Sequence, residues 1–196
     1  MFLSFTFKPK LLIMKKWLIG SIVGAILAFA WNFLSWTVLQ THNGEAKYTP
    51  SQDSLINILT STLKEDGVYM LPTVTPGSSM EAGEELGKKM NDNPWATVMY
   101  KSAYKHDMTM PMIRSFLVDL FLVFTLIYVL TRGGTPGGMR VFAGSVAVGL
   151  FTFLAGPYTM HIWFQTPTEA YTGHLIDALA TWGLVGIWLG WWLNRK

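Results

Sequence analysis

The sequence contains no cysteine and few charged residues. Without cysteine the chain can form neither disulfides nor thiolate metal sites, and it has no cysteine nucleophile. Only 14% of its residues are charged, against about 25% in soluble domains, whereas 51% are hydrophobic and nine are tryptophan. No basic stretch is interleaved with aromatic residues, so nucleic acid is not a predicted partner. The composition favours a protein of the lipid bilayer.

Long apolar runs are what the sequence has instead. A helix needs about 20 residues to cross about 30 Å of hydrocarbon. Four runs predict transmembrane helices over residues 17–39, 114–131, 141–164 and 175–193. The expected fold class is therefore an all-α membrane bundle of four transmembrane helices. Small residues four positions apart, such as Gly20 with Gly24 and Gly186 with Gly190, predict that these helices pack closely.

The basic residues of the short connections predict the orientation. Lysine or arginine occurs in the predicted segments 1–16, 132–140 and 194–196, whereas the loop 165–174 has neither. Basic residues stay on the cytoplasmic side, so both termini are expected in the cytoplasm and the long segment 40–113 outside. The expected location is the inner (plasma) membrane of a bacterium, crossed several times.

The outward segment 40–113 contains signals for both helices and strands. Thr49-Pro50-Ser51-Gln52 and Ser78-Ser79-Met80-Glu81 are typical of helix starts. GVYMLP (67–72) and WATVMYK (95–101) are typical of strands. We therefore expect a small outward α/β insert between transmembrane helices 1 and 2.

Three short strings carry a resemblance. They are WNFLSW at the end of the first apolar run, GVYMLP in the insert and NPWATVMY before the second run. With this layout the chain is similar to uncharacterised four-helix bacterial integral membrane proteins. The resemblance implies the membrane topology and implies no activity.

Polar side chains within the apolar runs are candidates for a site, because they are costly in hydrocarbon. The predicted topology brings five of them to one level near the outer surface: Asn32, Asp119, His161, His174 and Asp177. One interpretation is a structural network that satisfies its own hydrogen bonds. A second is a metal or haem site that uses His161 and His174, and a third is a proton- or quinone-linked role for Asp119 or Asp177.

KHDMTMPM (105–112) offers a second candidate site. In an extended segment His106, Met108, Met110 and Met112 would share one face. Imidazole and thioether ligands suit Cu(I), and His161 could approach as a further ligand. The alternative, which we favour, is an apolar strand that enters the membrane, because methionine commonly fills gaps in apolar surfaces.

The function expected from the sequence is that of a non-enzymatic integral membrane protein. It would be structural or accessory, with the lipid bilayer and other subunits of a membrane complex as partners. No catalytic motif such as GxSxG occurs, and no cofactor is predicted. The alternatives are an outward-facing copper-handling protein that uses His106 and the three methionines, and a membrane redox protein that binds haem through His161 and His174.

Overall fold

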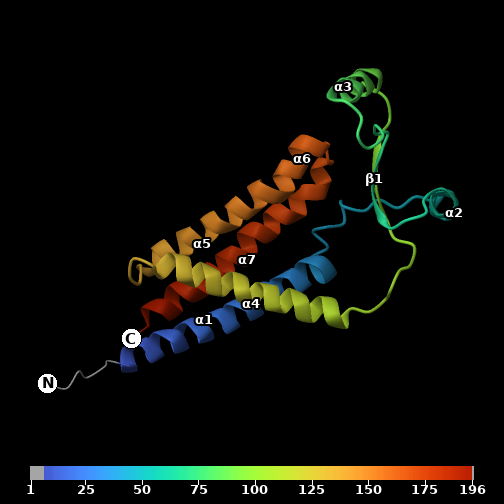
Figure 1. Ribbon diagram of the computed structural model, residues 1–196. Coiled ribbons are helices and arrows are strands. Elements are labelled where there is room, and N and C mark those ends of the chain that lie inside the picture. Colours follow the sequence, from blue (N-terminus) through green and yellow to red (C-terminus); the bar gives the residue numbers. More distant parts are fainter. Residues whose placement is uncertain (1–6, 196) are drawn as a thin grey trace. The chain divides into compact units, whose positions relative to one another are not determined.

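The computed structural model describes residues 7–195, and the side chains of residues 14–195. The chain is mostly helical and divides into two compact units. One unit comprises the residues up to Lys47 together with those from Asp107 onwards, and the other comprises Tyr48–His106. Each unit is described separately below (Figure 1).

The first unit holds four helical segments that are long and apolar enough to cross a membrane: Met14–Leu39, Thr109–Thr131, Gly138–Phe164 and Thr168–Asn194. They are built from α1 (Phe7–Leu34) with the π-helical turn η1 (Ser35–Leu39), α4 (Thr109–Thr131), α5 (Gly138–Phe153) with η2 (Leu154–Tyr158) and α6 (Thr159–Phe164), and α7 (Thr168–Asn194). The four expected helices are therefore present, each long and apolar enough to cross a membrane.

The third crossing segment changes its winding at Pro157. Proline has no N–H to donate and its ring crowds the carbonyl four residues earlier. The helix widens there into the π-helical turn η2 and continues as α6. A local π turn lets a helix pass such a residue without ending.

The second crossing segment begins earlier than the sequence predicts. We expected a membrane-entry strand and a helix from residue 114, but α4 begins at Thr109. The backbone N–H of Thr109 donates to Asp107 Oδ1 at 2.9 Å, which satisfies one of the free donors of the first turn. Pro111 lies within that turn, where its missing N–H costs nothing. The expected membrane-entry strand is therefore wrong for residues 109–112, which are helical.

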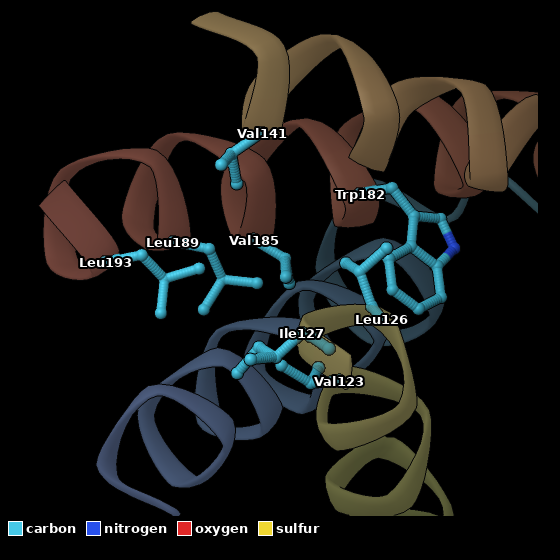
Figure 2. Close-up of a cluster of buried hydrophobic side chains, with 9 residues drawn as sticks. Val123, Leu126, Ile127, Val141, Trp182, Val185, Leu189 and Leu193 are labelled. Atoms are coloured by element: carbon cyan, nitrogen blue, oxygen red, sulfur yellow. The ribbon is translucent and has the colours of Figure 1, made fainter. Parts of the chain in front are cut away.

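The core of this unit lies where α1, α4, α5 and α7 meet. Its fully buried side chains include Ile127, Val141, Val185 and Leu189. Figure 2 shows Val185 and Leu189 of α7 pointing toward the side chains from α4. The small residues in the apolar runs predict close contacts of this kind. In lipid the hydrophobic effect does not drive helices together, so their association depends on close packing of side chains.

Glycine allows the closest helix contact, between α5 and α7. A Cβ atom placed on Gly190 would lie 2.8 Å from the carbonyl oxygen of Gly138, and one on Gly186 would lie 2.9 Å from Cβ of Ser145. The predicted small-residue pair of the last helix therefore faces a neighbouring helix of the same chain. Gly24 of α1 similarly faces Val123 of α4.

The second unit has the expected order of helix, strand, helix, strand. It contains α2 (Gln52–Thr62), β1 (Gly67–Leu71), α3 (Met80–Lys89) and β2 (Ala96–Tyr100). The strands pair antiparallel, with Gly67 opposite Tyr100. Ser79 caps α3 by accepting a hydrogen bond from the N–H of Ala82. Neither α2 nor α3 contains a buried residue.

Candidate functional site

A short loop after the first membrane segment forms the centre of the candidate site. Gln40 adopts a left-handed backbone conformation and ends the π-helical turn η1. The loop that follows then packs on the first turns of α7. Gly173 makes this approach possible, because a Cβ there would lie 2.7 Å from the carbonyl oxygen of Thr41 and 2.9 Å from Nδ1 of His42. The contact brings His42 beside the polar residues at the start of α7.

Asp177 of α7 anchors this arrangement through three hydrogen bonds. Trp31 Nε1 of α1 donates to Oδ1 at 2.9 Å, and Ser35 Oγ donates to the same oxygen at 2.5 Å. The other oxygen, Oδ2, lies 2.7 Å from Nε2 of His42. An ionised carboxylate only accepts hydrogen bonds, so the geometry assigns a proton to Nε2 of His42.

The imidazole of His42 is held on its face as well as on its edges. It stacks on the indole of Trp36, with ring centroids 3.9 Å apart and planes inclined by 5°. Its Nδ1 contacts Oε1 of Glu45, and its whole side chain is buried. Burial lowers the pKa of His42, but the hydrogen bonds to Glu45 and Asp177 outweigh this and raise the pKa above its ordinary value of 6.5.

His174 completes a cluster of metal-ligand type. Its Nε2 lies 3.3 Å from Glu45 Oε1, and its ring meets that of His42 edge to face at 5.0 Å. Potential ligand atoms of His42, Glu45 and His174 all lie within 4.8 Å of one another. With bonds of about 2.0–2.1 Å, two ligands of a tetrahedral zinc ion lie about 3.3 Å apart. The separation of His174 Nε2 and Glu45 Oε1 already fits such an ion, whereas atoms up to 4.8 Å apart would have to move closer together to enclose it.

The depth of the cluster follows from the length of α7. A helix of 27 residues is about 40 Å long, about 10 Å longer than the hydrocarbon core that it must cross. His174 lies near its first turns, and His42 and Glu45 lie beyond the first membrane segment. This length favours a position of these ionisable groups outside the hydrocarbon of a bilayer, where water can supply an ion.

The residues predicted as a buried polar cluster are partly brought together. Asn32, Asp119, His174 and Asp177 line one cavity of about 290 Å³ between the helices. Thr181 Oγ1 donates a long hydrogen bond of 3.5 Å to Asn32 Oδ1. Within residues 7–195, however, the buried Oδ2 of Asp119 has no hydrogen-bond partner. The partner expected for Asp119 is therefore not found as a direct contact.

His161 contacts residues at and just before the start of α7. Its Nδ1 lies 2.5 Å from the carbonyl oxygen of Thr166, and its ring packs on Tyr171 with centroids 4.5 Å apart. Tyr158 lies 6.0 Å away on the same side. The cluster of potential ligands contains His174 but not His161. Haem binding by His161 and His174 stays a prediction without support from their arrangement.

The methionine stretch is helical from Thr109 onwards. Met110 and Met112 lie in the first turns of α4, where residues two apart point about 200° from one another. Met108 directly precedes the helix, and His106 belongs to the other unit. The shared face expected from an extended chain is therefore wrong. Copper binding by these residues stays a prediction.

Sequence reasoning missed His42 and Glu45, which it assigned to the outward insert. Their signal was the spacing His-x-x-Glu directly after an apolar run, at the level of His174 and Asp177. Trp31 and Ser35 carried no separate signal, because an aromatic and a small polar residue are ordinary in a membrane helix. Comparisons of the chain with protein-family models, with curated proteins and with solved structures give no match.

Proposed function

We propose that this chain is an integral membrane protein that binds one divalent transition-metal ion through His42, Glu45 and His174. The observation that carries the proposal is the convergence of two imidazoles and a carboxylate within 4.8 Å. Two nitrogen ligands and one oxygen ligand, without sulfur, suit zinc and its neighbours better than Cu(I). The proposal keeps the metal-handling alternative of the sequence and replaces its ligands.

The hydrogen bond to Asp177 supports this role for His42. Histidine ligands commonly donate their second ring N–H to a carboxylate, which fixes the tautomer and the ring orientation. With Nε2–H directed at Asp177, Nδ1 is the ring nitrogen that faces Glu45, and a metal ion bound there would take the place of its proton. Stacking on Trp36 restrains the same ring against rotation. His42 is thus oriented before any ion arrives.

The positive-inside distribution of lysine and arginine supports a position of this cluster on the outer side of a bacterial plasma membrane, with both termini in the cytoplasm. Three protein ligands leave one position of a tetrahedral ion open, as in sites where zinc contacts water or a substrate. The proposed role is the capture of a metal ion from the outer compartment. Catalysis at the ion is not part of the proposal.

Metal binding by the purified full chain tests the proposal. After treatment with a chelator and reconstitution in detergent, we expect one Co²⁺ per chain, with the visible absorption of a tetrahedral site. His174→Gln should abolish this binding, and because His174 is partly exposed, the variant should still fold. His42→Gln should likewise abolish Co²⁺ binding. His161→Gln is the matched control, because that imidazole lies near the same end of the bundle but outside the cluster.

Retention of the Co²⁺ spectrum in His174→Gln and His42→Gln would contradict the proposal, as would its absence from the wild-type chain. Equal loss in His161→Gln would also contradict it, because the effect would then not be specific to the cluster.

A second candidate function is that of an accessory subunit, as expected from the sequence. The observation that favours it is that α2 leaves its apolar side chains unburied, including Leu55, Ile56 and Ile58. The helix contains no lysine or arginine, so it does not match a helix that lies on an anionic membrane surface. Its apolar residues fit an apolar surface on another membrane subunit.

Native electrophoresis of solubilised membranes tests this candidate. We expect the chain to migrate in a larger assembly, and Ile56→Glu to release it. Asn57→Glu adds the same charge one position further along the helix and should leave the assembly intact. Equal migration of all three proteins would exclude a role of α2 in subunit contact.

A further inference from the structure

A second cavity lies between the outer ends of two membrane-crossing segments. It is bounded by α1 with η1, by the start of α4, and by His174 and Asp177 of α7, and has a volume of about 630 Å³. These segments belong to the first unit, and Figure 1 draws α1 in blue and α4 in yellow-green. Ligand sites typically measure about 300–1,000 Å³, so the cavity is large enough for a small molecule or part of a lipid.

The walls of this cavity are mainly apolar. α1 and η1 contribute Phe29, Phe33 and Trp36, and the start of α4 contributes Met108 and Met112. These side chains are only partly covered: Phe33 is 56% exposed and Trp36 53% exposed. Unlike the glycine contacts of α5 and α7, this part of the bundle leaves uncovered apolar surface at the level of the bilayer. A hydrocarbon chain is the chemical group that such walls accept.

Polar groups line the same cavity without any cationic side chain. Asn32, Ser115, His174 and Asp177 are present, but among its lining residues none is lysine or arginine. The Asp177 carboxylate already receives hydrogen bonds from Trp31 and Ser35 and contacts His42. A phosphate headgroup would therefore find no cation, and a cationic headgroup would find a carboxylate that is already hydrogen-bonded.

Uncommitted hydrogen-bonding groups remain for a neutral headgroup. The amide nitrogen of Asn32 and the hydroxyl of Ser115 make no hydrogen bond to the part of the chain that the structure describes, and Nδ1 of His174 likewise. These groups can donate to and accept from hydroxyl and ester oxygens. A ligand of this cavity should thus combine an apolar chain with an uncharged, oxygen-bearing head.

We propose that the cavity between α1 and α4 binds a neutral acylglycerol. Its acyl chain lies along Phe29, Phe33 and Met112, and its glycerol hydroxyl and ester oxygens meet Asn32, Ser115 and His174. The charge pattern distinguishes this ligand from the phosphate-bearing lipids of the bilayer. The inference does not depend on metal binding, because the contacts involve no metal ion, and either proposal can fail alone.

Photo-crosslinking tests the lipid site on the full chain in nanodiscs. The probes are a diacylglycerol, a phosphatidylcholine and a phosphatidylglycerol that carry the same diazirine-labelled acyl chain. We expect the diacylglycerol to label peptides that contain residues 29–37 and 108–115, and to be displaced by unlabelled dioctanoylglycerol. The two phospholipids should label these peptides no more than other lipid-facing peptides.

Ser115→Phe should narrow the cavity, because Ser115 lies in its lining at an exposed position of α4. Each methylene of the acyl chain that no longer fits into the cavity weakens binding of the lipid about fourfold. Exclusion of two or more methylenes should therefore weaken it about tenfold or more. Leu117→Phe is the matched control. It adds a phenyl ring to the same helix at an exposed residue outside the lining, and labelling should not change.

Equal labelling by all three lipids would mean that the groove holds bulk bilayer lipid only, and would overturn the proposal. Preferential labelling by phosphatidylglycerol would overturn the choice of an uncharged head. Undiminished diacylglycerol labelling in Ser115→Phe would show that the lipid binds elsewhere. Because none of these readouts involves a metal ion, they are independent of the Co²⁺ measurement.

Discussion

Replacement of Asp177 by asparagine should weaken metal binding although Asp177 is not one of the proposed ligands. Trp31 Nε1 donates to one carboxylate oxygen at 2.9 Å, and Nε2 of His42 lies 2.7 Å from the other. Asparagine has one oxygen and one NH₂ group. In either orientation the NH₂ group faces an N–H donor, the indole of Trp31 or the imidazole of His42.

The two orientations have different consequences for the ion. If the NH₂ group faces His42, the imidazole can accept its hydrogen bond only as the Nδ1–H tautomer, which removes the nitrogen that we assign to the metal. If it faces Trp31, a partly buried N–H loses its acceptor, which costs about 1–3 kcal/mol. Loss of such a partner of a metal ligand typically lowers affinity 10- to 100-fold, or about 1.4–2.7 kcal/mol.

Competition with a chromophoric chelator measures this change, with thermal unfolding of the metal-free variant as a check that the fold is kept. Asp119→Asn is the control, because that carboxyl lines a cavity together with Asp177 and His174, but its buried Oδ2 makes no hydrogen bond to any of the three ligands. Its affinity should equal that of the wild type. A folded Asp177→Asn protein with unchanged affinity would refute the role of Asp177 and the tautomer assigned to His42.

Three further predictions concern packing, pH and orientation. Gly190→Ala should lower the melting temperature, because its Cβ would lie 2.8 Å from a backbone oxygen of α5, whereas Gly183→Ala, with nothing within 4 Å, should be neutral or up to about 1 kcal/mol stabilising. Because the pKa of His42 is raised, its contribution to the stability of the metal-free protein is full below pH 6.5 and is lost as pH rises through the raised value. Melting temperatures measured in chelator should therefore fall with increasing pH over this range. Unchanged melting temperatures would contradict the prediction. A cysteine at Met80 should react with an impermeant reagent on intact cells and one at Thr135 should not, and the reverse result would invert the topology.

The membrane helices were predictable because hydropathy over about 20 residues reports a property of each segment alone. The ends of the helices were less so. The early start of α4 depends on one hydrogen bond to Asp107, which a hydropathy criterion does not include. The strands of the insert followed from local composition, and both are present within a residue of their predicted bounds.

The candidate site was predictable only for its helical half. His174 and Asp177 lie three residues apart on α7, so periodicity places them on one face. His42 and Glu45 lie on a loop, and the path of a loop depends on contacts that no period reveals. Here the decisive contact is the fit of that loop against Gly173. Metal-ligand geometry thus arose from a backbone approach that the sequence analysis had no means to detect.

The distance along the chain between His42 and Asp177 has a consequence for biogenesis. These side chains meet in space but are 135 residues apart in sequence. At about 5–20 residues per second, a ribosome needs about 7 to 27 s to make the intervening chain. During that interval the loop with His42 and Glu45 has no partner from α7. If the proposed site binds an ion, it can do so only after α7 has been made, and metal loading would then report assembly of the loop with α7.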